Sequence, residues 1–414
     1  MYQSARGTAD ILPPEQPYWR YVEKTITEIT RLYGYQRIDT PVFEDTGLFR
    51  RSAGDYTDIV QKEMYTFDDR GGNSLTLKPE GTPAVCRAYI QHGMYNLPQP
   101  VKLYYVSPIF RYDRPQAGRY RQHYQFGAEA IGEGDPALDA EVIDMAWQFY
   151  TSLGLARLSL QLNSIGCKVC RPGYLAALKD YYAGYDNLCN DCKARLEKNP
   201  LRLLDCKQAS CQGIAESAPR NTEHLCDACT AHFSQLKEYL KLLQIPFSLN
   251  HRLVRGLDYY TRTVFEIQPE EEGGQSTIGG GGRYDDLIEE LGGKPTPGIG
   301  FATGIERIIL NLKQQGFIAP ETPGLRVLIA FMGEKAREEA IKLAAQLRRS
   351  GISAAAAAGV KSRKAQLRQA NALNVPYAVI LGEDELKAGT VTLRDMAGAR
   401  QETLNLADLP ERLK

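Results

Sequence analysis

The sequence predicts an α+β protein built from several domains, and three observations support this. The first half of the chain reads as strands and turns with helices on either side, a cysteine-rich segment follows, and the region after residue 324 alternates strand and helix as a βαβ unit does. With 414 residues, 43% of them hydrophobic, the chain is too long for a single core. About two to four domains are therefore expected.

Before the cysteines, periodicity separates helices from strands. Apolar residues recur at helical spacing from Gln16 to Tyr33, and Gly34 ends that helix. RIDTPVFED, residues 37–45, is predicted to be one strand, which Pro41 places at an edge or a bulge. Further strands are expected in SLTLKPEGT, VKLYYVSPIFRY, the hairpin of residues 110–132 and LSLQLNS, with a helix from Asp139 to Gly154.

That hairpin, FRYDRPQAGRYRQHYQFGAEAIG, places four arginines around one glycine turn. A planar guanidinium can hold two phosphate oxygens at once, and Gln125 and Glu129 are suited to orienting a small polar ligand. The alternative is an exposed, charged hairpin without a ligand. Other motifs have to decide between the two interpretations.

Two later segments carry further chemistry. RLVRGLDYYTRTVFE, residues 252–266, contains Arg255 and the pair Tyr259 and Tyr260, which suits an aromatic pocket but also an ordinary core. Residues 278–308, IGGGGRYDDLIEELGGKPTPGIGFATGIERI, put a glycine run at an expected strand edge and Arg307 on the last helix. This run has neither the P-loop pattern nor the setting of a dinucleotide fingerprint.

Together these motifs resemble, in order, those of bacterial histidyl-tRNA synthetases. The hairpin is similar to class II motif 2, GIGFATGIERI to motif 3, and LKPEGT and RLVRGLDYYTRTVFE to family signatures. The resemblance implies a class II synthetase antiparallel sheet with flanking helices, an inserted small domain and a C-terminal α/β anticodon-binding domain. The expected bounds are 1–164 and 238–318 for the catalytic domain, 165–237 for the insertion and 324–414 for the anticodon-binding domain.

The resemblance also implies a histidine–tRNA ligase. Such an enzyme activates L-histidine with ATP to histidyl-adenylate and pyrophosphate, then transfers histidine to the 3′ end of its tRNA. Mg²⁺ is expected to bridge the phosphate oxygens of ATP. A homodimer is expected because the stretch near TPVFED resembles motif 1, which forms the dimer interface of the family.

Residue roles follow by matching positions to the family motifs. Arg111 and Arg255 are the expected catalytic residues at the α-phosphate, and Arg307 is expected at the γ-phosphate. Arg114 and Gln116 resemble the loop that reads the acceptor end of the tRNA. The expected histidine-binding residues are Glu80, Thr82, Gln125, Glu129, Arg255, Tyr259, Tyr260 and Tyr284, and the ATP-binding residues are Arg111, Asp113, Arg119, Tyr120 and Arg307.

Eight of the nine cysteines fall between residues 167 and 229, and three pairs have C-x-x-C spacing. These eight, which could form two tetrahedral zinc sites, are Cys167, Cys170, Cys189, Cys192, Cys206, Cys211, Cys226 and Cys229. His224 or His232 could replace a sulfur, and the alternative is that the thiols are simply reduced. Cys86 is expected to be a small buried apolar residue.

Composition narrows the class of protein further. Lysine plus arginine equals aspartate plus glutamate at 50 each, which excludes a histone-like binder. No apolar run is long enough to span a membrane and no secretion signal is apparent, so a cytoplasmic location is expected. The basic run KSRKAQLR, Lys361–Arg368, suits anticodon binding or a solvated helix face.

Two rival interpretations come from other classes of protein. A regulatory subunit of ATP phosphoribosyltransferase resembles the synthetase catalytic domain, but such proteins usually lose the arginines that Arg111, Arg255 and Arg307 represent here. A pure RNA-binding module would need neither an imidazole pocket nor ATP arginines. The enzyme is therefore the favoured interpretation.

Overall fold

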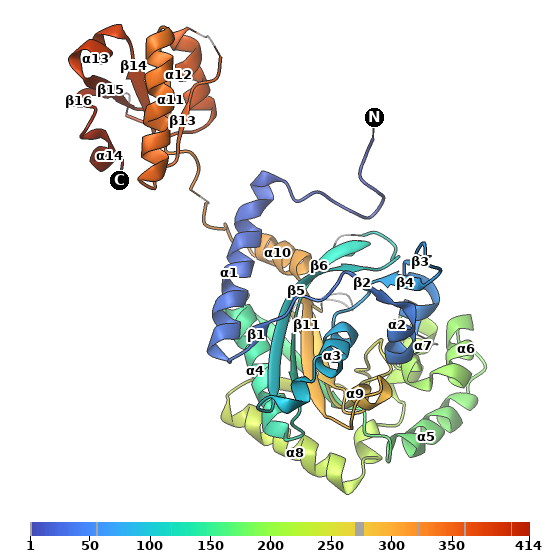
Figure 1. Ribbon diagram of the computed structural model, residues 1–414. Helices are drawn as coiled ribbons and strands as arrows, with labels where there is room; N and C mark the ends of the chain where they lie inside the picture. Colours follow the sequence, from blue (N-terminus) through green and yellow to red (C-terminus); the bar gives the residue numbers. More distant parts are fainter. Residues whose placement is uncertain are drawn as a thin grey trace. The chain divides into compact units, whose positions relative to one another are not determined.

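A computed structural model describes residues 2–54, 57–116, 118–269, 277–321, 323–359, 362–398 and 400–414. The chain divides into two compact units, Met1–Pro320 and Glu321–Lys414 (Figure 1). Within the described residues, no helix combines the length and the apolar character needed to cross a membrane.

An eight-stranded sheet forms the centre of the first unit. Its strands are β1 (Gln36–Arg37), β5 (Val101–Phe110), β6 (Gln122–Ile131), β7 (Leu158–Ser164), β8 (Phe247–Leu249), β9 (Thr261–Pro269), β10 (Gly279–Arg283) and β11 (Gly298–Gly304). Their order across the sheet is β1-β5-β6-β11-β10-β9-β7-β8. The inner pairs are antiparallel, and only the edge strands β1 and β8 pair in parallel. The predicted α+β class with an antiparallel sheet is confirmed.

Helices cover both faces of this sheet. On one face, α1 (Gln16–Leu32), α4 (Pro136–Ser152), α8 (Asp227–Leu242) and α10 (Ile305–Gln314) share one apolar core with the strands. On the other, α3 (Thr82–Gln91) and α9 (Leu287–Glu290) belong to a second core, and they lie in front of the strands in Figure 1. Helix α2 (Thr46–Ala53) packs against α3 and α9. The sheet is therefore buried between two layers.

The sequence predicts several of these elements closely. Helix α1 buries Val22, Ile26 and Ile29 at helical spacing, and Gly34, with φ of 75°, follows its end. Helix α4 starts three residues before the predicted Asp139, because the Asp135 side chain accepts the amide of Ala137 and caps the first turn. The predicted Asp139 therefore lies inside the helix.

Two strand predictions are wrong. Residues 37–45 do not form one strand: β1 ends at Arg37, and the chain enters a separate sheet at β2 (Phe43–Asp45) after Pro41, which has no amide hydrogen to donate. The glycine run β10 is not at an edge, because it lies between β9 and β11 in the middle of the sheet. The separate sheet has the order β2-β4-β3, with β3 at Thr66–Asp68 and β4 at Ser74–Leu77.

The cysteine-rich segment is helical. It contains α5 (Arg171–Ala183), α6 (Asn190–Lys198) and α7 (Ala209–Glu216) and continues into α8. Its apolar residues join the second core, which also holds Tyr259 and Tyr284 from the main sheet region. The segment therefore packs beside the pocket described below, and its expected bounds remain a prediction.

The second unit has a five-stranded sheet in the order β13-β12-β14-β15-β16. Its elements are β12 (Val327–Phe331), α11 (Glu334–Arg349), β13 (Ala354–Ala356), α12 (Arg363–Ala372), β14 (Tyr377–Leu381), α13 (Glu383–Ala388), β15 (Thr390–Asp395), β16 (Gln401–Asn405) and α14 (Leu409–Leu413). The first three strands are parallel, as the βαβ pattern predicts. The strand expected near Ile352 is the alanine run itself, and Lys361 lies outside the described residues.

Candidate active site

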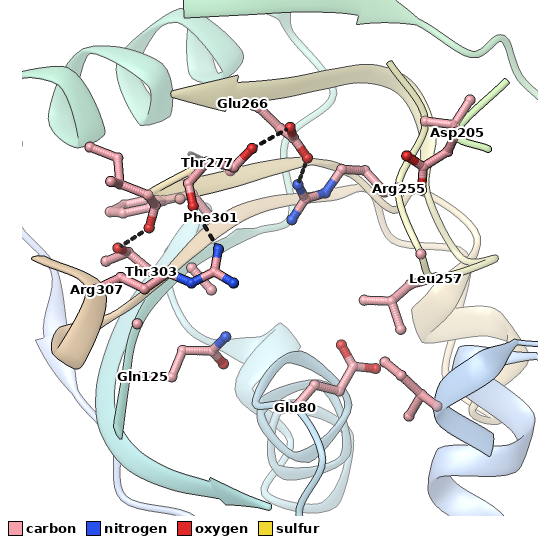
Figure 2. Close-up of a pocket in the computed structure, with 18 of the residues that line it drawn as sticks. Glu80, Gln125, Asp205, Arg255, Leu257, Glu266, Thr277, Phe301, Thr303 and Arg307 are labelled. Atoms are coloured by element: carbon pink, nitrogen blue, oxygen red, sulfur yellow. Dashed lines mark hydrogen bonds and ion pairs between the residues drawn. The ribbon is translucent and has the colours of Figure 1, made fainter. Parts of the chain in front are cut away.

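One pocket in the first unit, with a volume of about 900 Å³, contains all of the predicted histidine-binding and ATP-binding residues. Its walls come from the β5–β6 hairpin, the start of α3, the glycine strands β10 and β11, and the segment leading into β9. In Figure 2, the guanidinium groups of Arg255 and Arg307 lie across the open space from Glu80. The predicted tRNA residues Arg114 and Gln116 instead lie exposed on the hairpin connection and are not among the lining residues.

Two buried carboxylates occupy one end of the pocket. Glu129 on β6 accepts hydrogen bonds from the hydroxyls of Thr82 and Tyr284, both at 2.7 Å. Glu80 accepts one from the Tyr259 hydroxyl at 2.8 Å through Oε2. Its other oxygen, Oε1, is buried and has no hydrogen-bond partner within the described part of the chain.

Burial controls the ionisation of both groups. It raises the pKa of Glu80 to about 7, with the hydrogen bond from Tyr259 opposing the rise. It raises the pKa of Glu129 to about 8, although the hydroxyls of Thr82 and Tyr284 lower it. An incoming cation would therefore stabilise the ionised form of either carboxylate.

Glycines on β11 provide the space for this end. A Cβ at Gly300 would lie 1.9 Å from Oε2 of Glu129, and one at Gly298 would lie 2.3 Å from the ring of Tyr284. Neither separation is possible for real atoms, so any larger residue would displace the carboxylate or the ring. The glycine pattern that resembles motif 3 thus makes room for two side chains from other elements.

The other end of the pocket is rich in positive charge. Arg255 forms an ion pair with Glu266, which also accepts the Thr277 hydroxyl at 2.9 Å. The Thr277 carbonyl accepts Nη1 of Arg307 at 2.8 Å, so one chain of contacts joins the two arginines (Figure 2). Arg111 is anchored through Nε to the Pro79 carbonyl at 2.8 Å. The predicted ATP arginines are therefore held by the protein before any ligand arrives.

Some pocket residues were not singled out from the sequence. Glu266 is the last residue of the motif at residues 252–266, but its pairing with Arg255 depends on the strand geometry. His123 also lines the charged end, where burial and then the nearby Arg111 and Arg307 lower its pKa to about 3. Tyr105 fills the space beside Gly127 and Gly81, which lie far apart in the sequence, so no sequence signal pointed to it. None of the three belongs to a spacing pattern of its own.

The cysteines gather into two groups of four. One consists of Cys167, Cys170, Cys226 and Cys229, the other of Cys189, Cys192, Cys206 and Cys211, with all sulfurs of a group within 4.8 Å of one another. Neither histidine takes part: His232 pairs with Asp139 at 2.8 Å, and the ring of His224 lies 5.6 Å from that of Tyr174. Cys86 is fully buried, as predicted.

Comparison with known proteins agrees with this geometry. The sequence model of histidyl-tRNA synthetase matches residues 7–168 and 192–308, and that of an anticodon binding domain matches residues 326–414. The chain belongs to the histidyl-tRNA synthetase family. It is thus an aminoacyl-tRNA synthetase, and the sequence-based prediction of a histidine–tRNA ligase is confirmed.

Individual relatives match over nearly the full length. A histidine–tRNA ligase of Dehalococcoides mccartyi is 64% identical over 99% of this chain and 98% of its own. One of Pelotomaculum thermopropionicum is 53% identical over 97% of this chain and 95% of its own. The crystal structure of apo histidyl-tRNA synthetase from S. aureus has a TM-score of 0.84 and 40% identity, and the match covers 100% of both chains. Family membership implies histidine, ATP with Mg²⁺, and tRNA as substrates.

Proposed function

We propose that this pocket binds L-histidine and MgATP side by side, makes histidyl-adenylate and pyrophosphate, and then transfers histidine to the 3′ end of its tRNA. The observation that carries the proposal is the division of one cavity into a buried carboxylate end and an arginine end. An amino acid with a cationic amine fits the first, and a polyphosphate fits the second. Their boundary is where the two substrates would meet.

The carboxylate end suits free histidine. The unpartnered Oε1 of Glu80 is an acceptor for the ammonium group, with Thr82, Gln125 and Tyr259 around it. Glu129 offers an acceptor for an imidazole N–H, and the Tyr284 hydroxyl, which donates to Glu129 in this structure, would become the donor by turning toward the other ring nitrogen. Tyr260 closes the aromatic wall, with its ring centre 4.7 Å from that of Tyr259.

At the arginine end, the chemistry requires position and positive charge. A carboxylate oxygen of histidine attacks the α-phosphorus, the new C–O–P linkage forms, and the bond to pyrophosphate breaks. The attacking carboxylate is already ionised at neutral pH, so no general base is needed. Arg111 and Arg255 would stabilise charge at the α-phosphate and Arg307 at the γ-phosphate, with Asp113, Arg119 and Tyr120 around the rest of ATP.

The decisive test is exchange of labelled pyrophosphate into ATP, dependent on an added amino acid. We expect exchange with histidine and not with the other amino acids. Binding of histidine without exchange would instead indicate a regulatory paralogue that makes no adenylate. The transfer step is then tested by measuring how much histidine becomes attached to its tRNA.

The remaining roles concern the tRNA. Arg114 and Gln116 are proposed to contact the acceptor end, since they lie on the exposed turn beside the pocket. The second unit is proposed to bind the anticodon, and Arg363 and Arg368 on α12 belong to its most basic run. We retain the expected domain bounds, 1–164 with 238–318, 165–237 and 324–414, as part of the proposal. The cytoplasmic location also stays a prediction.

Both cysteine groups are proposed to hold structural zinc. A tetrahedral site with Zn–S bonds of about 2.3 Å separates its sulfurs by about 3.8 Å. The sulfurs of Cys167 and Cys170 are 3.8 Å apart, those of Cys167 and Cys226 3.9 Å, and those of Cys189 and Cys206 3.8 Å. A disulfide would need about 2.0 Å. Each ion would clamp parts of the cysteine-rich segment that lie far apart in the sequence, such as Cys167 and Cys226.

Metal analysis of the purified full chain tests the zinc proposal. Two equivalents of zinc are expected, falling to one in Cys189→Ser and in Cys226→Ser, because each variant breaks a different group. Cys86→Ser is the matched control and should keep both. Absence of zinc from protein prepared without chelators would contradict the proposal.

A homodimer is also proposed. Val42, Phe43 and Phe67 are 41%, 47% and 43% exposed, and the two phenylalanine rings lie 6.4 Å apart on the β2-β4-β3 sheet. Such an exposed apolar patch in the motif 1 region suits a subunit contact. Light scattering should give twice the chain mass, and Phe43→Glu should shift it toward a monomer. A wild-type monomer at micromolar concentration would contradict the proposal.

A further inference from the structure

A buried charged cluster lies behind the wall of the pocket. It consists of Asp139 on α4, His232 on α8, Thr263 on β9 and Arg283 at the end of β10. Asp139, Thr263 and Arg283 are fully buried and His232 is 5% exposed. Arg283 directly precedes the pocket residue Tyr284, and the proposed reaction uses no member of the cluster.

Every polar atom of its central ion pair is engaged. Oδ1 of Asp139 accepts Nε of Arg283 at 2.6 Å, while Oδ2 accepts the Thr263 hydroxyl at 2.6 Å and lies 2.8 Å from Nε2 of His232. The remaining nitrogens of Arg283 donate to the carbonyls of Glu133 and Asp135, both at 3.1 Å, and to Asp285 at 3.0 Å. The cluster thus fixes α4, α8 and two strands at one point.

That point is an irregularity of the sheet. Gly282 pairs with Val264 but Arg283 pairs with Thr261, so Arg262 and Thr263 have no partner on β10. Arg262 has φ of 48°, a left-handed conformation that is uncommon for a residue with a side chain. Such bulges often re-aim a side chain next to an active site. Here one of the two extra residues, Thr263, gives its hydroxyl to the cluster.

Tyr284 directly follows Arg283 at this irregularity. Its amide donates to the Gly298 carbonyl at 2.8 Å, and its hydroxyl donates to Oε2 of Glu129 at 2.7 Å. Replacing a buried ion pair by apolar residues often leaves stability unchanged, so stability alone is a weak reason for this cluster. Fixing the geometry of Tyr284 is a stronger one.

We propose that Asp139, with Arg283, His232 and Thr263, is a positioning device for histidine recognition that acts through Tyr284 on Glu129. The inference rests on the proposed function of the pocket. It gives the cluster no contact with substrate and no part in phosphate binding.

Pyrophosphate exchange by the full chain tests this with Asp139→Asn, which removes the charge and keeps the shape. We expect the KM for histidine to rise about tenfold, because a displaced positioning group weakens binding, while the KM for ATP changes by less than about twofold. The matched control is Asp144→Asn on the same helix, whose carboxylate bonds Tyr33 at 2.5 Å. It should leave both KM values unchanged.

A double-mutant cycle then tests whether Asp139 acts through Tyr284. In a Tyr284→Phe background, Asp139→Asn should raise the KM for histidine no further, because the group through which it acts is gone. An additive rise would overturn the inference, as would a lower melting temperature with the histidine KM unchanged. If Asp139→Asn does not fold, Thr263→Val and His232→Gln remove single cluster bonds and should show the same selective effect.

The outcomes distinguish a failure of the positioning inference from a failure of the proposed function, histidine-dependent adenylate formation. If wild-type protein shows no histidine-dependent exchange, the proposed function fails. If exchange is normal in wild type and Tyr284→Phe leaves the histidine KM unchanged, the role of Tyr284 fails and the positioning inference fails with it. If Tyr284→Phe raises the histidine KM but the variants of Asp139, Thr263 and His232 leave it unchanged, the positioning inference alone is overturned.

Discussion

The two ends of the pocket are organised differently. At the proposed histidine end, Glu80 and Glu129 are 3% and 1% exposed and are bonded to neutral hydroxyls. At the proposed ATP end, the side chains of Arg255 and Glu266 are 21% and 22% exposed, and Arg119 and Asp113, 3.4 Å apart, are 41% and 29% exposed. The proposal implies that the first end recognises its ligand by shape and hydrogen-bond pattern, and the second by charge. Changes at the two ends should therefore have different kinetic signatures.

The largest expected effect is at the arginine end. Arg255→Ala should lower the rate of adenylate formation about a hundredfold, or about 3 kcal/mol of transition-state stabilisation, because charge at the α-phosphate loses a donor. The KM for histidine should rise by a smaller factor, because Arg255 is only one of the eight expected histidine-binding residues. Single-turnover formation of adenylate measures the rate directly, and a near-normal rate would remove Arg255 from the mechanism.

An intermediate effect is expected at the histidine end. Gly300→Ala should raise the KM for histidine at least about tenfold, because the new Cβ takes space that Glu129 Oε2 occupies, with less effect on the KM for ATP. Gly304→Ala on the same strand is the matched control, since nothing lies within 4 Å of its Cβ. Equal losses for both substrates would mean that the two ends are not independent.

The smallest expected effect is on the stability of the empty protein. With pKa values raised from 4.5 to about 7 and about 8, Glu80 and Glu129 hold protons that the unfolded chain has already released. Their contribution is fully present below the unfolded pKa and is lost as pH rises through the folded values. The free energy of unfolding from this source should therefore fall between about pH 4.5 and pH 8.

Thermal melts at about pH 5.5 and about pH 8.5 measure this loss. Wild type should lose more stability over that interval than Glu129→Gln, which cannot ionise at this position. Glu28→Gln, at a side chain that is 60% exposed on α1, should behave like wild type. An equal loss in Glu129→Gln would show that Glu129 is already ionised in the empty pocket.

Much of this protein is encoded locally in its sequence. Apolar spacing predicts α1, alternation predicts β7, and the order of the motifs predicts the family and the residues that line one pocket. The helix and strand patterns can be read from the sequence because each depends on neighbours within one helix turn or one strand. Pairing of distant strands then follows from the family fold.

Other features were decided only by the tertiary structure. Residues 37–45 divide between two sheets on either side of Pro41. The glycine run lies between β9 and β11 in the middle of the main sheet, where a Cβ at Gly281 would lie 2.0 Å from the Gly300 carbonyl oxygen. The sorting of eight cysteines into two groups and the pairing of Arg255 with Glu266 also depend on distances across the fold. The sequence by itself determined which groups the pocket contains, through local patterns. Only the folded chain decided which of them touch, because those contacts join residues far apart in sequence.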